Sequence, residues 1–270
     1  MTDPRELLAR YLEQRWALGE TSYTFSSEGE AVELMASPNT QAPAQQPGPV
    51  RADGAEQWRK GAPDIPGPGI DIPVPSTDLF VGDPLADKDL DQLGELIRAC
   101  DQCALCGERT NAVPGEGPAH ADLMVVGEGP GAKEDQQGRP FVGRAGELLN
   151  DILAAIDCPR PTVFIANVVK CRPPGNRNPE GEEIAACLPY LYRQIAVIQP
   201  KVILAMGTVA AQALLEVRGP LSSMRNKVHR FRGIPLVVTY HPAALLRNPN
   251  WKKPTWDDVR IARRLLAGER

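Results

Sequence analysis

The sequence lacks any apolar run of membrane-spanning length, and residues 1–20 carry charges throughout. A helix that crosses a bilayer needs about 20 mostly apolar residues, and a signal peptide needs an uncharged apolar centre. We therefore expect neither feature, no membrane partner and a cytoplasmic location.

The two most familiar phosphate-binding patterns are missing as well. A glycine-rich turn with Gly127, Gly129 and Gly131 follows a short apolar run, but its third glycine stands one residue too early for the dinucleotide fingerprint. No Gly-Lys-Ser/Thr triplet follows the turn, as a Walker-type phosphate loop requires. The turn is therefore either a site for another kind of ligand or a tight turn without one.

Histidine is scarce, with 3 residues in 270, whereas cysteine is present in 6 copies. In a chain of this size without a secretion signal, six cysteines favour metal or cluster ligation over disulfides. Of His120, His229 and His241, only His241 opens a recognisable motif, HPAALLRNP. A lone histidine is more often structural than functional, so composition alone leaves its role open.

Charge and proline divide the chain into three parts. Residues 1–90 carry 7 Lys and Arg against 15 Asp and Glu, whereas residues 91–270 carry 23 against 19. Residues 35–84 hold 10 prolines among Gly, Ala, Gln and Asp, a composition that cannot bury a core. We predict an N-terminal helix at residues 4–20 with a tail to residue 34, a disordered linker at residues 35–88, and a folded domain at residues 89–270.

The folded part alternates strand and helix patterns. Short β-branched runs predict strands at residues 123–126, 162–169 and 201–206, and two more within residues 227–240 that turn at Gly233. Three-to-four spacing of apolar residues predicts helices at residues 90–99, 145–156, 182–198, 208–215 and 256–266. This alternation implies an α/β fold in which helices cover both faces of a mostly parallel sheet.

Three side chains stand just beyond predicted strands. Phe141 follows the polar loop after the glycine turn, Asn167 ends the second strand, and His241 follows the last one. Ligands of open parallel sheets bind in the loops at the carboxyl ends of the strands. From the residues alone, however, a Phe after proline is more often core, and an Asn caps a strand end about as often as it binds.

Four features taken together resemble a known family. They are GEGPGAKEDQQGRPFVGRAG, NVVKCRPPGNRNP, HPAALLRNP and the set of cysteines. Their order and spacing resemble the family 4 uracil-DNA glycosylases, the iron–sulfur branch of that superfamily, over about residues 100–266. The resemblance implies a three-layer α/β/α fold with a central, mostly parallel four-stranded sheet, and leaves the N-terminal part uncovered.

The resemblance implies roles for the three strand-end residues. Phe141 would stack on a uracil that has been flipped out of DNA. The Asn167 amide would read the O4 and N3–H edge of uracil and mispair with cytosine. A neutral His241 would donate to uracil O2 and stabilise the charge that builds as the glycosidic bond breaks.

The residue that activates water is less obvious. Related glycosylases outside this family carry Asp two residues after the first turn glycine, and Gly129 stands there in this chain. Glu128 is the first candidate because it lies in the turn that faces the base. Glu134 and Asp135 are the alternates, and Glu134 could instead exclude the methyl group of thymine.

DNA contacts are expected from two kinds of residue. Leu245, Leu246 and Arg247 would form a wedge that enters the duplex. Phosphate contacts are expected from Arg144, Ser222, Ser223, Arg225 and Lys227, which are otherwise ordinary surface residues.

The cysteines provide a separate test. Cys100, Cys103, Cys171 and Cys187 correspond to the four ligands of a [4Fe–4S] cluster in the family, although four thiolates alone also admit zinc. Cys106 suggests a ferredoxin run, but Thr110 stands where its fourth cysteine would fall. We therefore expect Cys106 and Cys158 to be free thiols.

The resulting expectation is a monomeric, monofunctional, nucleoid-associated glycosylase that removes uracil from single- and double-stranded DNA. A sister group links covalently to the sugar through a loop histidine, which residues 172–179 lack. The alternatives are an iron–sulfur electron-transfer protein and a nucleic-acid-binding module with structural zinc. No motif identifies a protein partner for the N-terminal arm.

Overall fold

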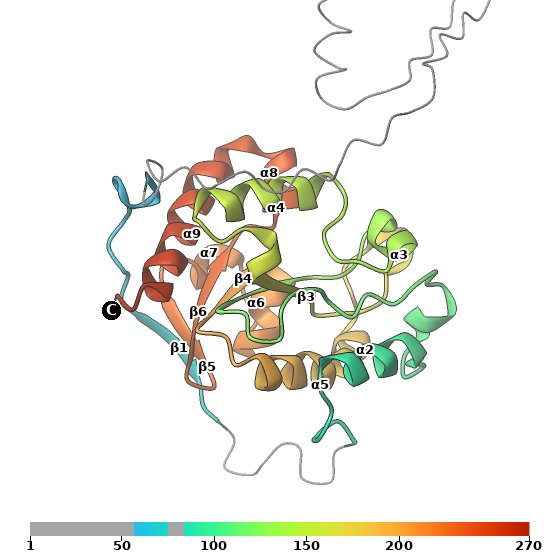
Figure 1. Cartoon of the computed structure of the whole chain (residues 1–270). Helices are drawn as coiled ribbons and strands as arrows, with labels where there is room; N and C mark the ends of the chain where they lie inside the picture. The colour runs from blue at the N-terminus through green and yellow to red at the C-terminus, as the bar shows by residue number, and fades with distance from the viewer. Residues whose placement is uncertain (1–56, 75–83, 270) are drawn as a thin grey trace, which may run out of the picture. The chain divides into compact units, whose positions relative to one another are not determined.

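Five-residue apolar runs build the centre of the fold. In the computed structural model, which describes residues 57–74 and 84–269, three strands are buried at every position: β2 (Leu123–Gly127), β3 (Val163–Asn167) and β4 (Val202–Met206). Burial on both faces is what parallel strands under helices require. With β6 (Ile234–Thr239) they form four parallel strands in the order β6-β4-β2-β3 (Figure 1).

Two further strands extend this sheet at the β6 side. β5 (Val228–Phe231) pairs antiparallel with β6, and β1 (Pro68–Ile72) pairs parallel with β5. The α/β class and the mostly parallel sheet are confirmed, but the expected number of four strands is wrong, because within residues 57–74 and 84–269 the sheet has six strands in the order β1-β5-β6-β4-β2-β3.

The strand β1 lies inside the segment predicted to be a disordered linker, and that prediction is wrong for residues 57–74. Gly69 has no room for a side chain because it lies against the His229 ring. His229 accepts a hydrogen bond from the Ile70 N–H (2.9 Å) and donates to the Met224 carbonyl (2.6 Å). Residues 57–74 therefore pack with the sheet although they precede residue 89. The helix predicted at residues 4–20 lies outside the described residues.

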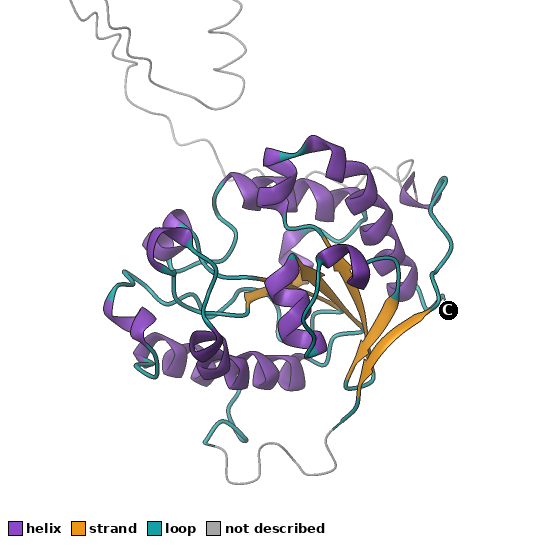
Figure 2. Cartoon of the chain, turned by 180° about the vertical axis from the view of Figure 1, so that it is seen from behind, coloured by secondary structure: helices purple, strands orange, loops and turns teal. Residues whose placement is uncertain are grey.

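Helices cover the two faces of the sheet, and successive strand residues point to opposite faces. Met124 and Val126 pack under one group, whereas Leu123 and Val125 pack under the other. The first group comprises α2 (Leu90–Ala99), α5 (Gly181–Ile198), α6 (Thr208–Leu215) and α7 (Leu221–Met224). The second comprises α4 (Arg144–Ala155) and α9 (Lys252–Leu266) (Figures 1 and 2). Trp58 of the short helix η2 (Gln57–Arg59) belongs to the same buried cluster.

Short elements shape the loops at the carboxyl ends of the strands. The polar loop after β2 contains α3 (Ala132–Gln137), for which the sequence pattern gave no prediction, and α8 (Pro242–Arg247) follows β6. Single 3₁₀ turns occur as η3 (Ala104–Gly107), η4 (Arg160–Thr162), η5 (Pro174–Asn176) and η6 (Pro249–Trp251). No helix of the described residues is long and apolar enough to cross a membrane.

Candidate active site

A cavity of about 390 Å³ lies where the parallel strands end, and we call it the sheet-edge cavity. Its walls come from the turn after β2, the end of β3, the loop before α5, and α8. It is lined by Glu128, Gly129, Pro130, Gly131, Glu134, Phe141, Ala145, Asn167, Pro173, Asn176, Arg177, Asn178, His241, Ala243 and Arg247. The fold thus brings Phe141, Asn167 and His241 together, although 100 residues of sequence separate the first from the last.

The Phe141 ring is held in place by its own backbone. Phe141 has a positive φ of 50°, a strained conformation for an aromatic residue. Arg160 donates hydrogen bonds to the Pro140 carbonyl (2.7 Å) and the Phe141 carbonyl (3.0 Å). Gly146 lies so close to that carbonyl that a Cβ would collide with it. These contacts fix the ring 5.3 Å from the His241 ring, with 29° between their planes.

Gly127 lets two of the cavity residues approach each other. A side chain at this position would collide with Asn167 Oδ1 (2.5 Å) and with the Phe141 ring (2.6 Å). The strand therefore has to end in glycine for the amide and the ring to share one wall.

Asn167 carries an unused hydrogen-bonding group. Its side chain is buried, and Oδ1 has no hydrogen-bond partner among the described residues. Its backbone carbonyl accepts a hydrogen bond from Lys170 Nζ (2.8 Å). Buried polar atoms in native proteins are nearly always paired, so an unpaired amide in a cavity wall favours a polar ligand there.

His241 is set up as a neutral hydrogen-bond donor. It caps α8, and its Nδ1 accepts from the Ala243 N–H (3.2 Å), which leaves the proton of the neutral ring on Nε2. Burial and the nearby Arg247 charge lower the pKa of His241 to about 4, against a smaller opposite effect of Glu134. The imidazole is therefore uncharged near neutral pH.

Two carboxylates line the cavity in different surroundings. Burial raises the pKa of Glu128, although the Arg247 charge opposes this. Glu134 is fastened to the loop, because its Oε1 accepts from the Val142 N–H (2.8 Å) and the Gly143 N–H (2.9 Å). Glu134 thus shapes the loop that carries Phe141, whereas burial makes the Glu128 carboxylate easier to protonate than an exposed one.

Asp135 does not belong to this cavity, contrary to the sequence-based expectation. Its buried Oδ1 accepts from the backbone N–H groups of Thr110 (2.8 Å) and Asn111 (3.3 Å). Neighbouring helical residues point about 100° apart, so Glu134 faces the cavity while Asp135 holds the preceding loop.

The rim of the cavity differs from the predicted wedge in one residue. Leu245 is only 1% exposed and cannot enter a duplex, whereas Leu246 is 41% exposed and Arg247 is exposed. Trp251 is 37% exposed nearby on η6, and its indole stacks on Tyr240 with centroids 4.8 Å apart and planes 4° apart. Arg144, the first residue of α4, is exposed as expected.

The prediction that Arg225 contacts phosphates is also wrong. It is buried and pairs with both carboxylate oxygens of Asp258, at 2.8 and 3.0 Å. Ser222, Ser223 and Lys227 are exposed.

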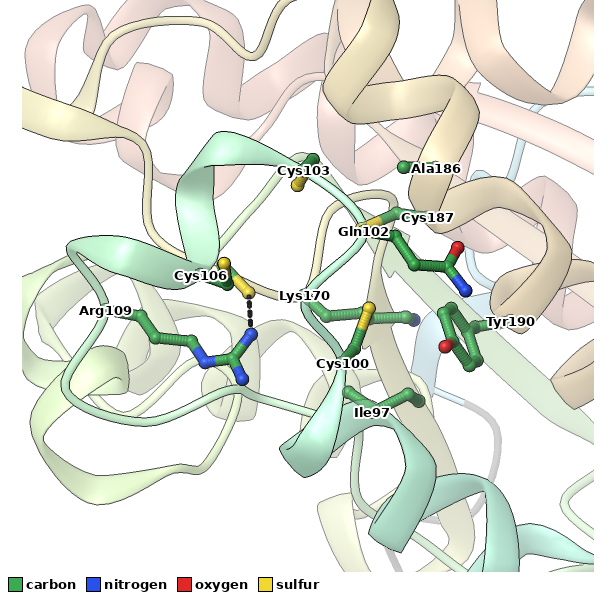
Figure 3. A pocket seen from close by; sticks show the side chains of 11 residues that line it. Ile97, Cys100, Gln102, Cys103, Cys106, Arg109, Lys170, Ala186, Cys187 and Tyr190 are labelled. Atoms are coloured by element: carbon green, nitrogen blue, oxygen red, sulfur yellow. Dashed lines mark hydrogen bonds between the residues drawn. The ribbon is translucent and has the colours of Figure 1, made fainter.

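The second notable cluster, which we call the cysteine pocket, lies on the α2–α5 side of the sheet. It is lined by Ile97, Cys100, Gln102, Cys103, Cys106, Arg109, Lys170, Cys171, Ala186, Cys187 and Tyr190. Figure 3 shows the side chains of Cys100, Cys103, Cys106 and Cys187 arranged around the pocket, and Cys187 belongs to α5. The four predicted ligands thus share one pocket, and Cys106, expected to be a separate free thiol, lines it too.

Two cations accompany these thiols. Arg109 donates to Cys171 Sγ (3.1 Å), and Lys170 lies buried in the pocket wall. Burial raises the pKa of the Cys171 thiol and raises that of Cys187 to about 11. These thiols are costly to ionise by themselves, and two buried or half-buried cations lie beside them. The arrangement fits an iron–sulfur cluster with four thiolate ligands, because the cations would balance its negative charge. Among the described residues, no group of three or more His, Cys, Asp or Glu forms a metal-ion site as the side chains stand.

Comparison with known proteins agrees with this geometry. The sequence model of the uracil DNA glycosylase superfamily matches residues 114–261. The type-4 uracil-DNA glycosylase of Pyrobaculum aerophilum is 50% identical over 169 residues, which cover 60% of this chain and 86% of that protein. Those of Sulfurisphaera tokodaii and Thermotoga maritima are 45% and 44% identical, covering 65% and 58% of this chain and 84% and 82% of theirs.

The chain belongs to the type-4 uracil-DNA glycosylases. The superfamily match begins shortly before β2 and ends within α9, so it includes the sheet-edge cavity, Cys171 and Cys187. The strand β1 precedes the matched residues, which explains why the resemblance to family 4 could not predict it.

The sequence analysis did not identify several residues that support the cavity of this type-4 glycosylase. Arg160 and Gly146 hold Phe141, Lys170 holds the Asn167 carbonyl, and Trp251 extends the exposed rim. Gly146 and Lys170 lie inside two of the quoted motifs, and Trp251 stands two residues beyond a third, so their position was the available signal. Arg160 carried none, because its role depends on a contact between distant segments.

Proposed function

We propose that this chain is a monofunctional DNA glycosylase that binds uracil flipped out of DNA and hydrolyses its N-glycosidic bond, leaving an abasic site. The observation that carries the proposal is the sheet-edge cavity, where a fixed ring, an unpaired amide and a neutral imidazole meet. These groups match the flat face, the O4 and N3–H edge, and the O2 atom of uracil.

Recognition begins with stacking and hydrogen bonding. Flipping a base costs a few kcal/mol, of which stacking on an aromatic ring returns about 1–3 kcal/mol. The Phe141 ring is already fixed by Arg160 and Gly146, so it need not be ordered when the base arrives. The Asn167 amide accepts from N3–H and donates to O4, and cytosine offers the opposite pattern at that edge.

Bond cleavage depends on charge that develops on the base. As the glycosidic bond breaks, negative charge builds on uracil O2, and the Nε2–H of His241 donates to it. A neutral donor is suited to this step because it binds the departing anion without protonating it first. Glu128 accepts a proton from water that attacks the sugar, a role that its raised pKa favours.

The exposed rim would contact DNA. Leu246 enters the stack from which the base has left, and Arg247 and Arg144 contact phosphates. The Trp251 indole offers a face to an unpaired neighbouring base, which supports action on single-stranded as well as double-stranded DNA. The enzyme acts as a monomer, since the sheet-edge cavity is complete within one chain.

Cys100, Cys103, Cys171 and Cys187 would hold a [4Fe–4S] cluster. When bound, it supplies a covalent tie between the segment before β2 and the β3–α5 segment, with no electron transfer in the reaction. Cys106 lines the same pocket but stands outside the set that corresponds to the family.

The direct test uses an oligonucleotide that contains one uracil. After incubation with the protein, alkali should cleave the strand at that position, in both single-stranded and duplex form, and free uracil should appear. A thymine-containing oligonucleotide is the matched control. Intact uracil oligonucleotide after incubation with iron-loaded protein would contradict the proposal.

A further inference from the structure

The segment Gly115-Glu116-Gly117 lies against β3, the last strand of the sheet. Glu116 forms an antiparallel bridge with Ile165, in which its N–H donates to the Ile165 carbonyl (2.9 Å) and its carbonyl accepts from the Ile165 N–H (2.7 Å). The two glycines have positive φ angles of 130° and 142°, and a Cβ on either one would press into Phe164 of the strand. The backbone of Glu116 is therefore fixed on the sheet edge, so its carboxylate is presented from a rigid base.

The Glu116 carboxylate binds two arginines that reach the loop carrying Phe141. Arg139, two residues before Phe141, donates to both carboxylate oxygens (2.8 Å each). The Nε of Arg160 lies 3.5 Å from one of these oxygens, and the Arg160 side chain is only 17% exposed. Its Nη1 also donates to Asn150 Oδ1 on α4 (3.2 Å). The Arg160 guanidinium is thus held from two sides, and Glu116 supplies the carboxylate that a largely buried cation requires.

The same guanidinium holds both peptide units that flank Phe141. Arg160 Nη2 donates to the Pro140 carbonyl (2.7 Å), in the unit before Phe141, and Nη1 donates to the Phe141 carbonyl (3.0 Å), in the unit after it. In an extended chain consecutive carbonyls point to opposite sides, so one donor group can reach both only where the residue between them is coiled. The positive φ of Phe141, 50°, is such a conformation, and an aromatic residue rarely adopts it unaided.

The two peptide units are not held equally. The Val142 N–H, in the unit after Phe141, also donates to Glu134 Oε1 (2.8 Å), so that unit has a second support. In the unit before Phe141, the Pro140 carbonyl accepts from Arg160, and that unit makes no other hydrogen bond within the described residues. Rotation of this unit changes φ of Phe141 and hence the direction of the ring. Arg160 therefore fixes the rotation that Glu134 leaves open.

We propose that Glu116 and Arg160 are positioning residues for base stacking: Glu116, anchored on the sheet edge, holds the Arg160 guanidinium, which bridges the two carbonyls around Phe141 and sets the ring in the wall of the sheet-edge cavity before a base arrives. Both residues lie outside the cavity lining and touch no base. The inference rests on the proposed function and deepens it, because it assigns part of the affinity for the flipped base to an ion-pair network outside the cavity.

The experiment measures how much a flipped uracil adds to DNA binding. The probe is a single-stranded oligonucleotide with one 2′-fluoro-2′-deoxyuridine, which presents uracil but resists cleavage, and the reference oligonucleotide carries thymidine at that position. The ratio of the two affinities, measured by fluorescence anisotropy, isolates contacts with the base. For Arg160→Met, as a full-length, iron-loaded chain, we expect this ratio to fall about fivefold, the lower end of what loss of a stacked base costs.

Two milder variants follow the network outward. Arg160→Lys keeps the charge beside Glu116 and can reach one carbonyl, so it should recover part of the loss. Glu116→Gln keeps the shape of the side chain but loses its charge, and it should lower the ratio by about twofold, as for one partly exposed ion pair. If Arg160→Met does not fold, Arg160→Gln takes its place in the same measurements.

A double-mutant cycle separates positioning of the ring from a general loss of stability. In a Phe141→Ala background, Arg160→Met should change the ratio by less than about 1.5-fold, because the ring that it positions is gone. Arg263→Met is the matched control, since Arg263 also donates to a backbone carbonyl, that of Ile156 (3.0 Å), but lies outside the sheet-edge cavity. It should lower the thermal unfolding midpoint and leave the ratio unchanged.

Four results would overturn the proposal. They are a wild-type ratio in Arg160→Met, a wild-type ratio in Glu116→Gln, an equal loss in the Phe141→Ala background, and an equal loss in Arg263→Met. Failure of the proposed function is distinguishable, because the wild-type protein would then bind the uracil and thymine probes equally and release no uracil from an ordinary deoxyuridine oligonucleotide.

Discussion

The sheet-edge cavity and the cysteine pocket share one stretch of chain, residues 167–177, but satisfy opposite requirements. Asn167 and Arg177 line the cavity, and between them in sequence Lys170 and Cys171 line the pocket. In the cavity, the buried Asn167 Oδ1 has no hydrogen-bond partner among the described residues, and burial raises the pKa of the Glu128 carboxyl group. The pocket instead pairs thiols with cations. The contrast indicates that the first is organised for a ligand that comes and goes, and the second for a group that stays.

The largest effect is expected at the cavity. His241→Ala removes the donor to uracil O2, so uracil release under single-turnover conditions should slow by about 10²–10³-fold, as when one oxyanion-hole donor is lost. His229→Ala is the matched control, because His229 joins β1 to the rest of the sheet and lies outside the sheet-edge cavity. It should lower the free energy of unfolding while folded protein keeps its rate. Equal rates for His241→Ala and wild type would remove His241 from the mechanism.

The pocket should respond differently to the loss of one side chain. Cys187→Ala should abolish most iron binding and lower the thermal unfolding midpoint by about 10 °C, if several kcal/mol of metal-linked folding energy are lost. Cys158→Ala changes a buried thiol on the other face of the sheet and should retain iron. Iron content and visible absorbance of the purified proteins measure iron binding in both variants, and thermal unfolding measures the midpoint. Retention of iron by Cys187→Ala would exclude it as a ligand.

A smaller effect should appear at the rim. Trp251→Ala should weaken binding of single-stranded DNA without uracil by about tenfold, because one stacked base is worth about 1–3 kcal/mol. Fluorescence anisotropy of a labelled oligonucleotide measures this affinity independently of catalysis. Leu96→Ala, which alters another exposed apolar residue but on α2, is the control and should bind as wild type does. A loss of the same size in both variants would contradict a specific role for Trp251.

The smallest effect concerns pH. Because burial raises the pKa of Glu128, its carboxylate form declines as the pH falls through that raised value, and uracil release should decline with it. His241, with a pKa of about 4, stays neutral in the same range and adds no second step there. Glu128→Gln should flatten the acid side of the pH–rate profile and lower the plateau rate less than His241→Ala does, because stabilisation of the leaving group supplies most of the rate. An unchanged acid limb in that variant would assign the titration to another group.

Much of the fold was predictable because its signals are local. The fully buried strands β2, β3 and β4 are short apolar runs, and Phe141, Asn167 and His241 follow strands whose carboxyl ends must meet. The strand β1 escaped prediction because its place depends on Gly69 and Ile70 contacting the distant His229. Sequence composition records only the prolines around it, and an edge strand tolerates these.

The site errors have a common physical origin. Leu245 and Leu246 are alike in sequence, but packing buries the first and exposes the second. Glu134 and Asp135 differ in the same way on α3, and Arg225 turns inward to Asp258. Which side of a short helix faces inward is decided by tertiary contacts. Motifs therefore identified segments that line the sheet-edge cavity and missed the orientation of single side chains.

The length of α8 has a consequence for the geometry of DNA binding. Its six residues span about 9 Å, with His241 capping one end and Arg247 closing the other. So short a helix holds its two ends at a nearly constant separation. If Arg247 contacts a phosphate, as proposed above, α8 therefore sets the distance between the DNA backbone and the imidazole that donates to the departing base.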